Sequence, residues 1–179
     1  SGGGSFSDVD SALDWLITNH AVNNVRVVNL SLGDGGEYAS PLTFPCTGSV
    51  TTNAINDLVD AGIAVVVASG NDGYDGGVSF PACVPAAISV GGVYDANVGS
   101  ISWCSATGCS PALCVDSTTS ADQFVCHSNS SADLDILAPD WRTRTSDLGG
   151  GVVNFSGTSA AAPYVSGLAA LLLEQDPSR

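Results

Sequence analysis

A run of six apolar residues ends at a serine, a glycine and an asparagine, and this junction constrains the fold more than any other part of the sequence. The run extends from Ile63 to Ala68 without polar alternation. Strands of a parallel sheet have this composition because helices bury both of their faces. Ligands of such sheets bind beyond the carboxyl ends of the strands. The junction therefore predicts a parallel sheet with Asn71 at its functional edge, although Asn-Asp-Gly is also a common turn sequence.

Helical and extended patterns alternate along the rest of the chain. Apolar spacing predicts helices over residues 7–21, with Ser7 or Asp8 as the N-cap, about 51–61 and about 158–174. Strands are predicted over 25–32 and 63–68, and near 88–91, 134–137 and 152–155. This order predicts an α/β fold with a mostly parallel sheet. A Cys-rich stretch at about 100–128 interrupts the pattern and is interpreted as an insertion.

The charge balance excludes two classes of partner. The 179 residues include 18 Asp and Glu but only four Arg and no Lys, which gives a net charge of -14. Nucleic acids and anionic membrane surfaces both require basic side chains, so we expect neither as a partner. No apolar run approaches the ~20 residues that span a bilayer.

The six cysteines predict disulfide bonds. Zinc ligands usually occur in Cys-x-x-Cys pairs or beside His, and here only His127, next to Cys126, fits that pattern. The spacing suggests that Cys46 pairs with Cys83 and that two bridges form within 104–126. Disulfides imply a secreted or periplasmic protein.

The segment from Asn154 to Pro163 carries the most specific chemical signal. A strand meets Gly157, then Thr158 and Ser159, and then a helix of small residues. We expect Pro163 in the first turn, where a missing N–H is tolerated. A serine at a helix N-terminus can act as a nucleophile while its own N–H stabilises an oxyanion. The alternative is that Thr158 or Ser159 is only an N-cap.

Together these segments resemble the subtilisin-like serine proteases. The matching blocks, in family order, are 28–33 (Val-Asn-Leu-Ser-Leu-Gly), 68–71 (Ala-Ser-Gly-Asn), 80–82 with 88–91, and 155–167, with weaker matches at 128–130 and 137–139. The resemblance implies a three-layer subtilisin-like α/β fold, and it covers nearly the whole chain except the insertion. It also implies a polypeptide substrate and no catalytic cofactor.

The resemblance assigns expected roles to individual residues. Ser159 would be the nucleophile, and Asn71 would form the oxyanion hole with the Ser159 N–H. Two segments would line the primary specificity pocket: Ser31, Leu32 and Gly33, and Ala68, Ser69 and Gly70. The first of these segments would pair with an extended substrate as an added strand. Calcium is common in the family, but no twelve-residue calcium loop is present and no metal ligand is identified.

The sequence also departs from the family pattern. Ala160 and Tyr164 replace the usual Met and His, which we interpret as packing changes, and Asp140 replaces a usual Gly, which we interpret as a change in a surface turn. The family order is Asp, then His, then Ser, but the Asp-Thr-Gly and His-Gly-Thr blocks are both missing. Neither His20 nor His127 is expected to be the general base. We therefore expect residues 1–179 to be the second half of a catalytic domain, with both partners upstream.

Three other interpretations compete with this one. A sedolisin-like peptidase shares the Gly-Thr-Ser motif but should carry Asp in place of Asn71. A degenerate, non-catalytic binding module would explain the missing partners but should also have lost Ser159. An acidic, disulfide-rich interaction domain would make the motifs a coincidence.

Two finer expectations concern specificity and glycosylation. Asp72 at the pocket rim would favour basic substrate side chains, and Ser79 would narrow the pocket floor. The sequons at Asn29 and Asn154 lie in predicted core strands, so only Asn129 is expected to be open to glycosylation.

Overall fold

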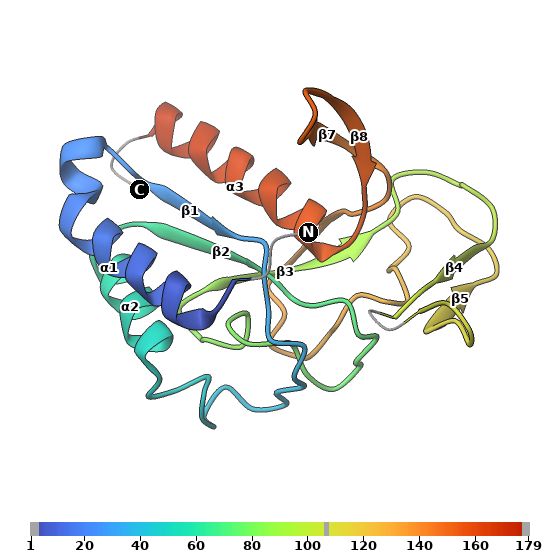
Figure 1. The fold of residues 1–179 in the computed structure, drawn as a ribbon, viewed down its shortest axis with the longest axis horizontal. Coiled ribbons are helices and arrows are strands. Elements are labelled where there is room, and N and C mark those ends of the chain that lie inside the picture. Colours follow the sequence, from blue (N-terminus) through green and yellow to red (C-terminus); the bar gives the residue numbers. More distant parts are fainter. Residues whose placement is uncertain (1–3, 106–107, 177–179) are drawn as a thin grey trace.

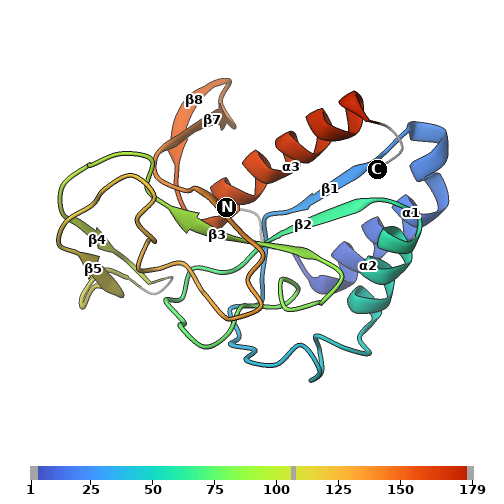
Figure 2. The ribbon, with the colours of Figure 1, turned by 180° about the vertical axis from the view of Figure 1, so that it is seen from behind.

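The chain folds into three layers, as the sequence predicts (Figure 1). The structure, a computed structural model, describes residues 4–105 and 108–176. Helices α1 (Phe6–Asn23) and α2 (Val50–Asp60) cover one face of the central sheet, and α3 (Thr158–Gln175) covers the other, as the reverse view also shows (Figure 2). None of these helices has the length and hydropathy that crossing a bilayer requires.

The central sheet has four parallel strands in the order β1-β2-β3-β6. Their bounds are β1 Val27–Leu30, β2 Ala64–Ala68, β3 Ile88–Val93 and β6 Ile136–Pro139. The predicted apolar run forms β2, which lies between β1 and β3 and is buried on both faces. Because β1, β2 and β3 run in the same direction, the residues that follow them gather at one edge of the sheet.

Side chains at the helix starts explain two of the boundaries. Ser5 is the N-cap of α1 and forms a capping box with Asp8. The expectation that Ser7 or Asp8 caps this helix is therefore wrong, because both already lie inside it. The Ser49 hydroxyl accepts the Thr52 N–H at 3.0 Å and begins α2.

Two hairpins lie outside the central sheet. Strands β4 (Ile101–Trp103) and β5 (Cys114–Asp116) pair within the Cys-rich insertion, and β7 (Thr143–Asp147) pairs with β8 (Gly151–Phe155). Strands β4, β5 and β7 were not predicted from the sequence. The predicted strand at 152–155 exists as β8, but all of its residues are exposed and its partner is antiparallel.

All six cysteines form disulfide bonds, as predicted. Cys46 bonds Cys83, and the insertion contains Cys104–Cys109 and Cys114–Cys126. The first bridge belongs to the core between the sheet and helices α1 and α2. The other two belong to the insertion, which packs around a smaller cluster of Tyr94, Trp103 and Val125.

Candidate active site

Three predicted site residues meet where the strands end and α3 begins. Ser31 follows β1, Asn71 follows β2, and Ser159 lies in the first turn of α3. The side chains of Ser31 and Ser159 each bond the other residue's backbone: the Ser31 hydroxyl donates to the Ser159 carbonyl at 2.8 Å, and the Ser159 hydroxyl donates to the Ser31 carbonyl at 3.2 Å. Ser159 is half-buried, so its hydroxyl is fixed but accessible.

Pro163 explains why the Ser159 carbonyl can accept this bond. The helix begins at Thr158, so Pro163 lies in its second turn and not in the first turn as predicted. An ordinary residue at position 163 would donate its N–H to the carbonyl four residues earlier, which is that of Ser159. Proline has no N–H, so this carbonyl remains open to the Ser31 hydroxyl.

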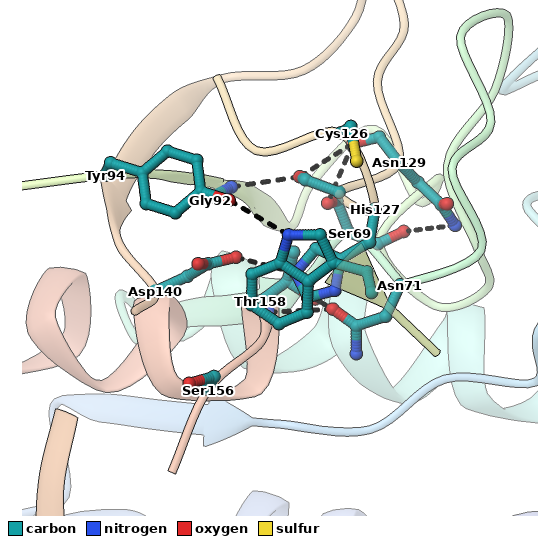
Figure 3. Close-up of polar contacts among 12 residues, drawn as sticks. Ser69, Asn71, Gly92, Tyr94, Cys126, His127, Asn129, Asp140, Ser156 and Thr158 are labelled. Atoms are coloured by element: carbon teal, nitrogen blue, oxygen red, sulfur yellow. Dashed lines mark hydrogen bonds and ion pairs between the residues drawn. The ribbon is translucent and has the colours of Figure 1, made fainter. Parts of the chain in front are cut away.

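The side chain of Asn71 is held through its amide oxygen. Its Oδ1 accepts the Thr158 N–H at 2.8 Å and the Thr158 hydroxyl at 2.9 Å (Figure 3). Two donors on the same atom fix which end of the amide is oxygen. Among the described residues, no hydrogen-bond partner occupies Asn71 Nδ2. The free N–H groups are therefore available to a negatively charged oxygen beside Ser159.

Two glycines allow these close approaches. Gly70 has φ +108°, and a Cβ at this position would collide with Asn129 and Ser79. Gly157, the N-cap of α3, has φ +112°, and a Cβ there would lie 3.2 Å from Asn71 Oδ1. L-residues rarely adopt such φ values, so both turns beside Asn71 require glycine.

Asn129 supports the loop that carries Asn71. This side chain is fully buried, and its Oδ1 accepts the N–H groups of Asp72 at 2.9 Å and Tyr74 at 3.1 Å. Its Nδ2 donates to the Ser69 carbonyl, to Asp72 Oδ2 and to the Ser79 hydroxyl. This role of Asn129 was not predicted from the sequence, in which the weak match at 128–130 was its only signal.

The burial of the three sequons is the reverse of the expectation. Asn129 is enclosed, whereas Asn29 and Asn154 are exposed. Asn29 lies on the outermost strand of the sheet, and Asn154 lies on the exposed hairpin. Within residues 4–105 and 108–176, Asn29 and Asn154, and not Asn129, are therefore open to solvent.

A cavity of about 360 Å³ lies beside Ser159 and Asn71. Four of the predicted pocket residues line it, namely Leu32, Gly33, Ala68 and Gly70. Asp72 and Ser79 line it as well, together with Cys104 and Ser105 from the insertion. Ser69 is fully buried and donates its hydroxyl to the Asn129 carbonyl, so it supports the loop from behind.

The two histidines lie elsewhere. His20 is in α1, on the opposite face of the sheet from α3. His127 is buried, and its Nε2 lies 2.8 Å from Asp140 Oδ2 (Figure 3). In the described part of the chain no hydrogen bond joins either ring to Ser159. Asp140 is fully buried, so its interpretation as a change in a surface turn is wrong.

Comparison with known proteins decides the family. The family model described as the subtilase family matches residues 1–178. The chain belongs to the subtilase family. A subtilisin of Bacillus pumilus is 29% identical over 99% of this chain, and an extracellular serine proteinase of Thermus sp. (strain Rt41A) is 35% identical over 99%. The crystal structure of a cold-adapted subtilisin-like serine proteinase superposes with a TM-score of 0.66 at 29% identity, covering 98% of this chain.

This subtilase chain spans only part of its relatives. It covers 51% of the Bacillus pumilus subtilisin, 34% of the Thermus proteinase and 50% of the cold-adapted proteinase chain. Among residues 4–105 and 108–176, no cluster of three His, Cys, Asp or Glu side chains could hold a metal ion.

Proposed function

We propose that this subtilase chain carries the nucleophile and the oxyanion hole of a serine endopeptidase. One arrangement carries the proposal: Ser159 lies at the N-terminus of α3, and Thr158 fixes Asn71 beside it with its amide donors free. The helix dipole and the free N–H groups favour negative charge at this position.

The proposed reaction proceeds through an acyl-enzyme. Ser159 Oγ attacks the carbonyl carbon of the scissile peptide bond and passes its proton to a general base. The carbonyl oxygen becomes an oxyanion, which accepts hydrogen bonds from Asn71 Nδ2 and the Ser159 N–H. The C–N bond then breaks, the base returns the proton to the leaving amine, and water hydrolyses the ester on Ser159.

The hydrogen bond from the Ser159 hydroxyl to the Ser31 carbonyl suggests how substrate binding is linked to activation of the nucleophile. Without a base, the Ser159 hydroxyl donates to the Ser31 carbonyl. A base that takes this hydrogen bond would free the Ser31 carbonyl for the N–H of a polypeptide. An extended substrate could then pair with Ser31, Leu32 and Gly33 as an added strand.

The cavity beside Ser159 would receive one substrate side chain. Asp72 lines it and would favour a basic side chain, and Ser79, which also lines it, would narrow its floor. Asp72 also accepts an Asn129 donor, which holds its carboxylate in place.

Helix α3 supports the proposal that more polypeptide completes the site. Its sheet-facing side is buried, yet its outer side exposes Tyr164, Leu168, Leu171 and Leu172. A helix that is apolar on all sides is normally covered on all sides. The chain spans about half or less of its relatives. We propose that the covering segment lies upstream of residue 1 and carries the catalytic Asp and His.

The setting and accessory ions are proposals as well. Three disulfides favour a secreted or periplasmic protein, and one relative is named as extracellular. The net charge of -14 argues against nucleic-acid and membrane partners. No cofactor is required by the proposed chemistry. Structural calcium in the acidic loops is a separate hypothesis, and metal analysis of the purified full-length protein tests it.

Labelling with a fluorophosphonate tests the proposal. The probe should label the full-length protein at Ser159, and Ser159→Ala should abolish the label. Ser166→Ala, in the same helix, is the matched control and should label normally. Residues 1–179 alone should show neither labelling nor peptidase turnover, since Ser159 lacks a base. A full-length protein that contains no Asp-Thr/Ser-Gly and His-Gly blocks, and that is not labelled, would favour the binding-module interpretation.

A further inference from the structure

A buried His–Asp pair lies beneath the site, outside the proposed catalytic chemistry. His127 directly follows Cys126, which forms a disulfide bond with Cys114 in the insertion. Asp140 directly follows β6. The side chains are 5% and 0% exposed, and His127 Nε2 lies 2.8 Å from Asp140 Oδ2. From the sequence, His127 was expected in the insertion and Asp140 in a surface turn, and nothing indicated that their side chains meet.

The backbone of the His127 segment holds the loop that carries Asn71. The His127 carbonyl accepts the Gly73 N–H at 2.8 Å, two residues beyond Asn71. Two residues after His127, Asn129 donates its backbone N–H to the Gly70 carbonyl at 2.9 Å. Its side chain holds the rest of the same loop. A shift of the His127 backbone would therefore move the backbone on both sides of Asn71.

The backbone of Asp140 holds the turn that carries Ser159. The Asp140 carbonyl accepts the Gly157 N–H at 3.0 Å, and Gly157 is the N-cap of α3, two residues before Ser159. The Asp140 N–H donates to the Val93 carbonyl at 3.1 Å, which joins this turn to β3. A shift of the Asp140 backbone would therefore move the turn at Gly157 and, with it, Ser159.

The surroundings restrict how the pair can move. The Trp103 ring lies over His127 at a centroid distance of 3.7 Å, and Trp141 packs edge-on against Trp103. A Cβ at Gly92 would collide with the Asp140 carboxylate, so glycine at this position of β3 leaves the room that the carboxylate occupies. Burial raises the pKa of Asp140, and the hydrogen bond from His127 opposes this rise. Losing either partner leaves a buried polar group without its bond, which is costly.

We propose that His127 and Asp140 are positioning residues that join the loop bearing Asn71 to the turn bearing Ser159. The pair sets the separation of the two oxyanion donors, Asn71 Nδ2 and the Ser159 N–H. The pair acts indirectly, because no hydrogen bond joins either side chain to Ser159 among the described residues. This inference rests on the proposed peptidase function and names two further residues on which that function depends.

Two matched variants of His127 test the inference in the full-length protein. The amide nitrogen of Gln can occupy the place of His Nε2, whereas Asn is too short to reach it. His127→Gln should therefore keep the bond to Asp140, and His127→Asn should lose it. Fluorophosphonate titration of active sites counts the competent molecules, so kcat refers only to folded enzyme. Tyr94→Phe removes a hydroxyl that donates to Asp116 and accepts the Trp103 Nε1–H in the same buried cluster. It leaves the bond between His127 and Asp140 in place and serves as a control for general destabilisation.

The expected result separates positioning from stability. His127→Asn should lower kcat about 10-fold to 100-fold, which is less than the loss of a whole oxyanion donor, with KM changed by less than about 3-fold. His127→Gln and Tyr94→Phe should keep kcat within about 3-fold. In an Asn71→Ala background, His127→Asn should lower kcat by less than about 3-fold, because residues that act together are not additive.

Other outcomes would overturn the inference. Equal kcat values for His127→Asn and His127→Gln would show that the bond to Asp140 does not matter. Equal losses with and without Asn71 would show that the pair does not act through the oxyanion hole. A wild-type protein that is neither labelled nor active would overturn the proposed function, and this inference with it. An active wild type with either of the first two results would overturn this inference alone.

Discussion

Ser31 and Ser159 hold each other through two hydrogen bonds, each from one side chain to the other residue's backbone carbonyl. The two residues are 128 positions apart in the sequence, and the pair ties the end of β1 to the first turn of α3. Pro163 makes the pair feasible, since it leaves the Ser159 carbonyl without a helical donor.

This pair predicts a specific dependence of stability on Pro163. Ser31→Ala should lower the free energy of unfolding by about 1–2 kcal/mol, because the Ser159 carbonyl loses its partner. In a Pro163→Ala background the helix can supply an N–H, so the same substitution should cost less. Urea unfolding of the four proteins measures the difference. Ser11→Ala, at an exposed site in α1, is the control and should be nearly neutral. Equal costs in both backgrounds would contradict the role assigned to Pro163.

Thr158 should control the orientation of the Asn71 side-chain amide. Thr158→Val keeps the shape but removes the hydroxyl that donates to Asn71 Oδ1 and accepts the Gly70 N–H. We expect kcat to fall about 10-fold, because one whole oxyanion donor is worth about 10²–10³, a value that comes from a subtilisin. Thr158→Ser retains the hydroxyl and should stay within about 3-fold. Steady-state kinetics of the full-length protein checks both, and equal kcat values for the two variants would contradict this role.

The Tyr38 hydroxyl should ionise at a higher pH than an ordinary tyrosine. A 2.6 Å hydrogen bond to Asp34, with burial and the carboxylate charge, raises the pKa of Tyr38 from 10.0 to about 12. A raised pKa means that this contribution to stability is complete below pH 10 and is lost as the pH rises through about 12. The tyrosinate absorbance of wild type minus Tyr38→Phe isolates this group. In Asp34→Asn the midpoint should fall toward the ordinary value, and an unchanged midpoint would exclude Asp34 as the cause.

The disulfides should differ in their contribution to stability. Denatured, unreduced protein should show no free thiol, because all six cysteines are paired. Cys46 and Cys83 close a loop with a sequence separation of 37, whereas Cys104 and Cys109 are separated by 5. Chain entropy predicts that replacing the first pair by Ser lowers the free energy of unfolding by about 4 kcal/mol, and that replacing the second pair lowers it by about 2 kcal/mol. Urea unfolding compares the two double variants, and the reverse order would contradict the entropic account.

Local sequence pattern was enough to predict several parts of the protein. The apolar run at 63–68 is buried on both faces, so its composition alone identified it as an inner strand of a parallel sheet. The segment 155–163 marked a strand, a turn and a helix start, and the family motif within it indicated which side chains would meet there. The cysteine spacing also predicted the bridge between Cys46 and Cys83 and two bridges within 104–126, but it left open which of the four later cysteines pair with each other.

The tertiary structure decided the features that depend on contacts between distant segments. Asp140 and His127 have no local signal, since their pairing arises only when β6 and the end of the insertion lie side by side. Asn129 appeared to be a surface sequon because its partners come from residues 69–79, about 50–60 positions away. The strand at 152–155 has the composition of a core strand, yet its neighbour is the exposed β7. Local sequence sets the conformation of a segment, but burial and hydrogen-bond partners are set by what packs against it.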